Sequence, residues 1–349
     1  MRRPTSASTR PESTFSIPAL ASVFTNNLPY QREEFMTFDY TSVGFHTFDA
    51  LCRPVTQIPP NGDTYFVEDF AIAISGAAGA AAVVAAKHGL KVQAVGGVGN
   101  DLMGDWVLRR YADFGVDTEM MQRCTNFMTS SSIVTTRPDG QRPALHKRGA
   151  TAGFYVDDEQ VDRVLDTKIF HIGGVGLMDA MDKGRNAELL REAQNREIVT
   201  TLDVFATTSD DLRLLKPLLA NTDFFMPSEE EAMALSGMSD LEDVCQFLLD
   251  QGVGAVVMTL GANGAMYRDQ QGRKFDVPAF QIDVVCTCGC GDAFNAGFAT
   301  GLHLGRSIEE CIRFGQASSA QNAMGLGSQA VVSNLENTIK FMENQPVRS

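Results

Sequence analysis

One glycine-rich turn decides how this chain is interpreted, and it lies in the stretch Cys286-Thr287-Cys288-Gly289-Cys290-Gly291-Asp292-Ala293-Phe294. The segment before it, 280–285, has a β-type composition, and the residues after it repeat apolar and small side chains at helical spacing as far as Leu302. The sequence therefore predicts a strand, a tight turn and a helix that begins near Asp292. Free N–H groups at such a helix start form an anion pocket, because glycines before them let a ligand reach the backbone.

Asp292 lies at the lip of this predicted pocket. A carboxylate there can take a proton from an attacking hydroxyl group, while the N–H groups stabilise negative charge that develops on a phosphate. An isolated aspartate at a helix start is more often a helix cap than a base. The turn by itself leaves both interpretations open.

Outward from the turn, the chain alternates short β-type runs with longer helical patterns from residue 39 onward. This alternation is typical of a mainly parallel sheet covered by helices. Two β-rich stretches, about 53–74 and 130–148, break the rhythm, and the second contains a turn at 138–140 that predicts a hairpin. We predict a three-layer α/β/α fold with a mainly parallel central sheet and a small β flap, or lid, made by those stretches. The strands of the body are expected at 41–48, 92–96, 169–172, 198–203, 223–226 and 255–260, and its helices at 77–88, 101–113, 292–304, 308–324 and 335–344.

The composition excludes several classes of partner. The 349 residues include 29 basic and 43 acidic side chains, a net charge of -14 that would repel a phosphate backbone. No stretch approaches the roughly 18 apolar residues that a membrane span needs. Seven cysteines form an odd, scattered set rather than a disulfide scaffold. We therefore expect a soluble cytoplasmic protein with reduced thiols, and neither nucleic acid nor a membrane as its partner.

Residues 1–36 differ in composition from the rest of the chain. Arginines among Ser, Thr and Pro precede a short apolar run, which superficially suggests a signal peptide. Glu12 and Pro18 interrupt that pattern. We expect a disordered leader, or a start codon that really lies at Met36, followed by one domain over 37–345.

The glycine-rich turn resembles the signature of the ribokinase-like (PfkB) carbohydrate kinases, which reads Asp-Thr-Thr-Gly-Ala-Gly-Asp-x-Phe. Gly289, Gly291, Asp292 and Phe294 match that signature in register. The resemblance implies an ATP-dependent kinase of a small sugar or sugar-like substrate, with Asp292 as the catalytic base. It also implies that the backbone from Gly289 through Cys290 and Gly291 to Asp292 is the anion hole.

Five further segments match the same family in the order that it requires. On the substrate side, the resemblance assigns a hydroxyl-binding role to Asp49, at the end of a first strand, and a substrate-side turn to Ser75, Gly76 and Ala80. The segment 96–104 is also close to the family pattern. The resemblance assigns Glu231 to magnesium, which it would position through water. To ATP it assigns Ser228, Thr259, Gly261, Gly264 and Asn322. Each match has a structural alternative: Asp49 as a strand-end cap, Glu231 as a solvated helix charge and Gly261 as an ordinary turn.

The chain departs from the family at four positions. Cys286 replaces the first acid of the signature, in a loop that commonly borders a monovalent-cation site, so dependence on potassium is doubtful. Ala80 replaces a substrate-side asparagine, and an unpaired substrate hydroxyl there would cost roughly 1–3 kcal/mol. Ser75 and Ser228 replace a glycine and an asparagine. The phosphate side therefore matches the family better than the sugar side does.

Three features of the flap and its surroundings leave alternatives open. Arg142 or Arg148 could help to close the site. The resemblance suggests a homodimer through the flap, although the apolar stretch 70–74 is explained equally well as a core strand. The alanine-rich turn 77–82 would also suit a nucleoside kinase of the same fold.

The losses at Ala80, Ser228 and Cys286 would also suit a non-catalytic sugar or nucleotide sensor, although Asp292 argues against it.

Two motifs are rejected. The run 325–330 formally satisfies a dinucleotide-binding pattern, but it follows a helix instead of joining a strand to a helix. The alternating cysteines 286, 288 and 290 suggest zinc, but no histidine cluster or Cys-x-x-Cys pair supplies further ligands. We expect these thiols to pack beneath the turn.

Overall fold

The computed structural model describes residues 36–205 and 208–348. The expectation for the leader therefore lies outside the described residues, apart from Met36. Within these two ranges, no helix combines the length and the apolar character needed to cross a bilayer.

A sheet of nine strands forms the centre of the molecule. All neighbouring pairs from β5 to β11 run parallel, and β12 and β13 add an antiparallel edge. The prediction of a mainly parallel sheet is thus confirmed. In spatial order the strands are β13 (Lys274–Val277), β12 (Ala265–Asp269), β11 (Ala255–Thr259), β10 (Phe224–Phe225), β9 (Val199–Val204), β8 (Thr167–Val175), β1 (Phe38–Gly44), β4 (Val92–Gly99) and β5 (Asp117–Cys124).

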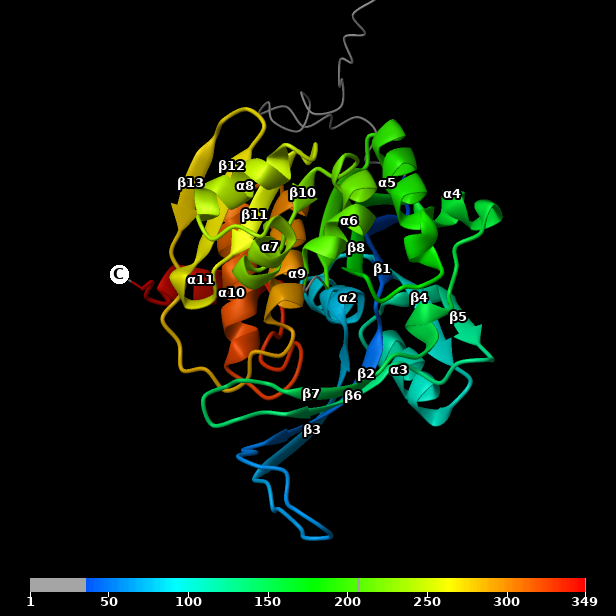
Figure 1. Cartoon of the computed structure of the whole chain (residues 1–349), viewed down its shortest axis with the longest axis vertical. Helices are drawn as coiled ribbons and strands as arrows, with labels where there is room; N and C mark the ends of the chain where they lie inside the picture. The colour runs from blue at the N-terminus through cyan, green and yellow to red at the C-terminus, as the bar shows by residue number, and fades with distance from the viewer. Residues whose placement is uncertain (1–35, 206–207, 349) are drawn as a thin grey trace, which may run out of the picture.

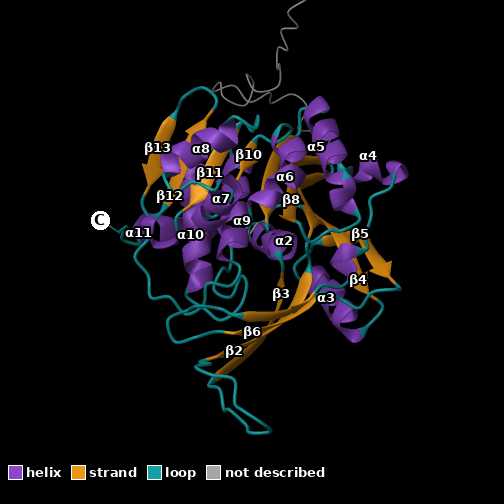
Figure 2. Ribbon diagram, viewed as in Figure 1, coloured by secondary structure: helices purple, strands orange, loops and turns teal. Residues whose placement is uncertain are grey.

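Helices cover both faces of this sheet, which gives three layers (Figure 2). One face packs against α4 (Val161–Val164), α5 (Arg185–Asn195), α6 (Leu212–Leu219), α7 (Glu229–Ser236) and α8 (Leu241–Leu249). The other face packs against α2 (Ala77–Lys87), α3 (Leu102–Asp113), α9 (Cys290–His303) and α10 (Ile308–Ala323), and α11 (Leu335–Asn344) packs on α10. The three-layer prediction is confirmed.

A second sheet of four strands projects from the body, as Figure 1 shows at the bottom of the view. We call it the flap sheet. Its order is β3 (Asp69–Ser75), β2 (Thr47–Arg53), β6 (Ser131–Thr135) and β7 (Ala144–Lys147), and β6 and β7 form the predicted hairpin. The chain first enters the flap sheet at His46, which is buried. The two ring nitrogens of His46 are hydrogen-bonded, Nδ1 to the Tyr111 hydroxyl at 2.6 Å and Nε2 to the Val95 carbonyl at 3.0 Å.

Two predicted strands are wrong. The predicted strand 41–48 is in fact parts of β1 and β2, which belong to different sheets. The break falls after Gly44, whose φ of 137° favours glycine. A Cβ atom added there would lie only 2.1 Å from the Gly173 carbonyl oxygen, so other residues are excluded. The predicted strand 280–285 pairs only through an isolated bridge between Phe280 and Val347, because no neighbouring strand is available to it. The strands β5, β12 and β13 were not predicted.

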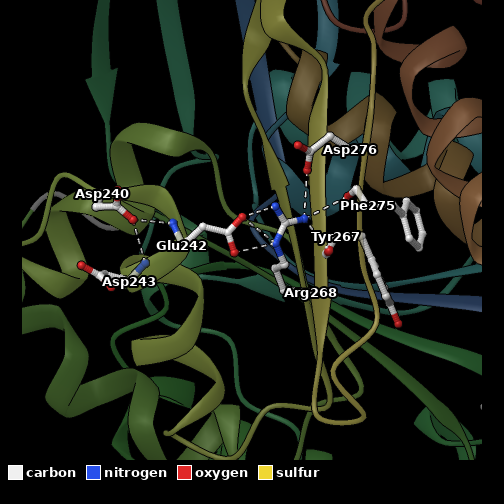
Figure 3. A network of polar contacts seen from close by, with 7 residues as sticks. All are labelled: Asp240, Glu242, Asp243, Tyr267, Arg268, Phe275 and Asp276. Carbon is white, nitrogen blue, oxygen red and sulfur yellow. Dashed lines mark hydrogen bonds and ion pairs between the residues drawn. The ribbon is translucent and has the colours of Figure 1, made fainter.

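A single arginine ties the antiparallel edge of the central sheet to α8 (Figure 3). Arg268 of β12 forms an ion pair with Glu242 at 2.5 Å and another with Asp276 at 2.9 Å. Its Nη1 group also donates to the carbonyl oxygens of Tyr267 and Phe275. Asp240 caps α8 by accepting from the backbone of Glu242 and Asp243. Because its guanidinium group is nearly buried, Arg268 fixes the position of this edge.

Candidate active site

The predicted phosphate-side residues gather where the parallel strands end. Thr259 is the last residue of β11, and Glu231 follows β10. A β-bridge between Ser228 and Thr259 brings these two segments together. Ligands of parallel α/β sheets bind at the carboxyl ends of the strands, so this edge is the candidate site.

The signature turn exposes backbone N–H groups at the start of α9. Gly289 is the N-cap, with a φ of 75° that favours glycine, and a side chain there would lie 2.7 Å from the Ser328 hydroxyl. The amide of Cys290 donates to the Thr287 carbonyl. Among the described residues, none accepts from the amide of Gly291, and a Cβ atom at Gly291 would meet nothing within 4 Å. An anion can therefore approach this amide directly.

Asp292 is the third residue of α9 and is not its cap, because the cap position belongs to Gly289. Burial, together with the charges of Asp49 and Glu231, raises the pKa of Asp292 to about 6, whereas the charge of Arg142 opposes this rise. A carboxylate with a pKa near neutrality is suited to take up a proton. The helix-cap alternative for Asp292 is not what the structure shows.

Asp49 lies inside β2 rather than at the end of a strand, which corrects that part of the prediction. Its side chain is buried and accepts a hydrogen bond from the Thr47 hydroxyl at 2.8 Å. Its charge contributes to the raised pKa of Asp292 and opposes the lowering of the His146 pKa by burial, so these three groups share one region. The His146 ring stands edge-on to Phe45, with 5.3 Å between the ring centroids.

Asp203, near the end of β9, belongs to the same carboxylate cluster and was missed by sequence reasoning. Its Oδ2 accepts from the Asn295 amide at 2.8 Å, and its Oδ1 accepts from the backbone of Val204. Burial raises its pKa well above the usual range, and the charges of Glu231 and Asp292 add to this. The signal that could have found it is an acid at the end of a parallel strand.

Glu231 completes a capping box with Ser228. The Ser228 hydroxyl and backbone N–H both donate to Glu231 Oε2, at 2.8 and 2.9 Å. Burial raises the pKa of Glu231. Nowhere in the described ranges do three His, Cys, Asp or Glu side chains stand together so that they could hold a metal ion. Mg²⁺, which usually keeps several waters and binds through one or two carboxylates and substrate phosphates, fits this sparse arrangement.

The predicted ATP-side glycines lie in the turn that connects β11 to β12. Gly261 and Gly264 have φ angles of 54° and 100°, which favour glycine, and a side chain at Gly264 would meet the Val277 carbonyl oxygen at 2.0 Å. Asn322 is buried in α10, and its amide donates to the Cys288 carbonyl at 2.7 Å. Its side-chain oxygen accepts from the backbone of Gln329. Its assignment to ATP stays a prediction.

The substrate-side turn leads into α2. Gly76 caps this helix with a φ of 83°, and a side chain there would lie 2.4 Å from the Phe45 carbonyl oxygen. The hydroxyl groups of Ser75 and Ser328 are hydrogen-bonded at 2.7 Å. Ala80 is buried in the first turns of α2. Ser75 is therefore engaged with the loop after α10, and its contact with a substrate stays a prediction.

The two arginines of the flap hairpin differ in their surroundings. Arg142 donates to the Thr287 carbonyl at 3.1 Å, and its charge opposes the rise in the pKa of both Asp292 and Glu231. Arg148 instead forms an ion pair with Asp179 at 2.6 Å. Arg142 is thus the flap arginine that lies near the carboxylate cluster.

Two of the three signature cysteines pack beneath the turn as predicted, whereas Cys290 is only partly buried. Cys286 and Cys288 are buried with Leu51 and Val134 of the flap sheet. The thiol of Cys286 lies 3.4 Å from the Thr136 hydroxyl. Burial raises the pKa of Cys288 to about 12.

Known proteins share both the fold and the sequence pattern. A family model described as pfkB family carbohydrate kinase matches residues 47–334. A ribokinase from Haemophilus influenzae is 26% identical over 288 residues, which cover 81% of this chain and 92% of the relative. A cytidine kinase from Thermococcus kodakarensis is 30% identical over 161 residues, which cover 44% of this chain and 54% of the relative. The structure of Arabidopsis thaliana ribokinase, complexed with ribose and ATP, superposes with a TM-score of 0.74 at 24% identity, covering 88% of this chain and 99% of that one.

The three-layer fold, with a glycine-rich turn at the start of α9, is that of the ribokinase-like proteins. The chain belongs to the pfkB family of carbohydrate kinases, and it is a phosphotransferase that acts on a hydroxyl group. The resemblance predicted from the signature is thereby confirmed.

Proposed function

We propose that the chain transfers the γ-phosphoryl group of ATP to a hydroxyl group of a small sugar or sugar-like substrate. Asp292 takes the hydroxyl proton as the oxygen attacks the γ-phosphorus atom, and the bond to the β-phosphate breaks to release ADP. The observation that carries this proposal is the position of Asp292, which is partly buried, follows the free amide of Gly291 and has a carboxyl pKa raised to about 6.

On the phosphate side, the backbone from Gly289 to Asp292 is proposed to stabilise the charge that develops on the transferred group. Arg142 would contribute a positive charge from the flap, since its charge already opposes the rise in the pKa of Asp292. Glu231 and Asp203 would hold magnesium through water. When bound with ATP, that ion neutralises charge on the phosphates. Ser228, Thr259, Gly261 and Gly264 are proposed to line the nucleotide site.

On the substrate side, Asp49 is proposed to orient the acceptor. Its carboxylate is buried and near Asp292, so it can accept hydrogen bonds from substrate hydroxyl groups next to the one that reacts. Thr47 holds this carboxylate at 2.8 Å.

A nucleoside kinase of the same fold is the second candidate. The ring pair of Phe45 and His146, close to Asp49, offers an aromatic surface that a base could contact. The Thermococcus kodakarensis relative is described as a cytidine kinase. A non-catalytic sensor is disfavoured, because Asp292 and the free amide beside it are both in place.

An ATP-consumption screen against sugars, sugar acids and nucleosides tests the proposal, with Asp292→Asn as the control. We expect turnover of at least one sugar or sugar acid that the substitution abolishes. Turnover of nucleosides alone would favour the second candidate. Saturable binding without turnover of any compound would favour the sensor, and turnover unaffected by Asp292→Asn would refute the mechanism.

We also propose that two copies pair through the flap sheet. Its outward face carries an apolar row across all four strands, in which Ala50 is paired in register with both Ile72 and Ile133, and Ile133 with Leu145. Ile72, Ile133 and Leu145 are 45%, 54% and 68% exposed, and Phe70 next to them is 69% exposed. A second copy would cover this row, since the same surface is self-complementary in a twofold dimer.

The proposed location is the cytoplasm. All seven cysteines are unpaired, which suits a reducing compartment. The kinase domain is proposed to span 37–345, with the flap sheet as part of it.

A further inference from the structure

The loop between α10 and α11, residues 325–332, touches both sides of the proposed site. We call it the bracing loop. Its Ser328 hydroxyl lies 2.7 Å from that of Ser75 in the substrate-side turn and 3.6 Å from the Cys288 thiol in the signature turn. One side chain thus joins the turn that faces the acceptor to the turn that faces the phosphate.

Gln329, the next residue of the bracing loop, has a φ of 59°, a conformation that non-glycine residues rarely adopt. Its backbone N–H donates to the Asn322 side chain, and its own amide donates to the Ile74 carbonyl at 2.9 Å. Its side chain is nearly buried. A conformation of this kind persists only where the surroundings hold it, so the bracing loop is held in one arrangement.

Lys87, the last residue of α2, supplies much of that hold. Its ammonium group donates to the Gln329 carbonyl at 2.9 Å and to the Val332 carbonyl at 2.7 Å. It also lies 5.5 Å from the centroid of the Phe114 ring. Two backbone carbonyl groups and an aromatic face therefore surround one positive charge. Burial lowers the pKa of Lys87 to about 8, with Arg110 of α3 adding to this, so the group is charged at neutral pH.

The residues near Cys286 do not fit the monovalent cation that the family resemblance implies. Such an ion is bound by carboxylate and carbonyl oxygens, whereas Cys286 offers a thiol, which is buried and contacts Thr136. The Ala323 carbonyl, at the end of α10, already accepts from the amides of Val285 and Cys286, at 2.8 and 3.2 Å. Two protein donors thus already occupy this carbonyl oxygen.

We propose that Lys87 is a positioning residue for phosphoryl transfer: its ammonium group is a tethered cation that holds the bracing loop against both turns. Because a buried thiol stands where such an ion would need an oxygen ligand, the chain is expected to need no added monovalent cation. The kinetic test of this inference rests on the proposed function. A second test, by chemical modification, rests only on the contacts of the bracing loop.

The kinetic test compares Lys87→Ala, Lys87→Arg and the unaltered chain in potassium, sodium and tetramethylammonium salts at equal ionic strength. We expect kcat of the unaltered chain to change less than about twofold among the three salts, because no site for a free ion is used. Lys87→Ala should lower kcat by about tenfold or more while the KM for ATP changes little, because the catalytic groups lose their alignment. Lys87→Arg should retain part of the activity.

Chemical rescue separates a positioning role from a general loss of stability. Ammonium or methylammonium ions should restore kcat of Lys87→Ala in a saturable manner, since they can donate to both vacated carbonyl groups. Tetramethylammonium has no N–H group and should not. The matched control is Lys340→Ala on α11, where an exposed lysine pairs with Glu336, and it should behave as the unaltered chain in every salt.

A second measurement needs no turnover. Alkylation of the buried Cys288, followed by mass spectrometry, should be faster in Lys87→Ala, because the contact between Ser328 and Cys288 loosens. Ammonium ions should restore that contact and slow the alkylation again. If no compound is phosphorylated, this measurement still decides the inference, and only the proposed function fails. Three results would each overturn the inference. They are strong activation of the unaltered chain by potassium, full activity of Lys87→Ala, and a failure of ammonium to restore either kcat or the slow alkylation of Cys288.

Discussion

The side-chain amide of Asn322 donates to the backbone carbonyl of Cys288 across 2.7 Å. Cys288 directly precedes the glycine that caps α9, and the same amide lies 3.4 Å from the Cys290 thiol. The side-chain oxygen of Asn322 accepts from the backbone of Gln329. One buried side chain therefore connects the signature turn to the bracing loop.

The first prediction concerns this connection. Asn322→Leu keeps the approximate volume but removes the donor and the acceptor. The free energy of unfolding should fall by about 1–3 kcal/mol, because the partners stay buried without hydrogen bonds. In steady-state kinetics, kcat should fall by roughly tenfold, with little change in the KM for ATP. Asn344→Leu on the exposed end of α11 is the control. A large rise in the KM for ATP at constant kcat would instead support the direct ATP contact predicted from the sequence.

The second prediction concerns pH. Because a general base must be ionised and the pKa of Asp292 is about 6, kcat/KM should fall as the pH drops through about 6 and level off above about 7. Asp49→Asn removes a negative neighbour and should shift this limb to lower pH. Arg142→Gln removes a positive neighbour and should shift it to higher pH. Asp283→Asn, at an exposed position, should leave it in place, and a profile that is flat between pH 5 and 7 would contradict the assignment.

The third prediction separates catalysis from stability at Asp292. Asp292→Asn should lower kcat by roughly 10²–10⁴-fold, since the proton acceptor is lost. The melting temperature should stay constant or rise, because the substitution removes a partly buried carboxylate whose raised pKa shows that its ionisation is unfavourable in the folded chain. Calorimetry alongside kinetics checks both. A variant that is inactive because it is unfolded would refute this reasoning.

The fourth prediction concerns the edge of the central sheet. Arg268→Met leaves two backbone carbonyl groups and the carboxylates of Glu242 and Asp276 without their partner. Unfolding by urea should show a loss of about 2–3 kcal/mol. Arg306→Met, which breaks only an exposed pair with Glu310, should cost less than about 0.5 kcal/mol. Equal effects of the two substitutions would show that Arg268 does not fix this edge.

The fifth prediction concerns the flap dimer. Light scattering after size exclusion should give the mass of two chains for the unaltered protein and of one chain for Ile133→Glu, because a charge in the apolar row cannot be buried unpaired. Phe66→Ser, at an 89% exposed residue outside the flap strands, is the control for lost apolar surface. A single-chain mass for the unaltered protein would remove the proposal.

The sequence predicted those features that depend on local backbone requirements. Gly289 and Gly291 could be assigned to a turn at a helix start because one needs a left-handed conformation and the other leaves the backbone accessible. The helices α9, α10 and α11 were predicted within one or two residues at each end, because their apolar spacing and their flanking turns agree.

Features set by contacts between distant segments could not be predicted in this way. The place of Asp203 at the end of a strand was visible in the sequence, but its hydrogen bond to Asn295 and its nearness to Glu231 and Asp292 depend on residues far along the chain. The segment 280–285 has β-type residues but forms only an isolated bridge. Whether such a segment joins a sheet depends on a neighbouring strand from elsewhere in the chain, which its own sequence does not reveal. The division between β1 and β2 at Gly44 depends on the Gly173 carbonyl oxygen of the neighbouring strand.

The hydrogen bonds between the base of the flap sheet and the body have a mechanical consequence. His46 is held on both ring nitrogens by the body, and Ser75, where β3 returns, is held by Ser328. Where β6 begins, the hydroxyl of Ser130 is bonded to that of Thr151 at 2.8 Å. With hydrogen bonds to the body at three of its crossings, the flap sheet is expected to resist rotation as a rigid unit. We expect admission of the acceptor and release of the product to involve bending at the far ends of its hairpins instead.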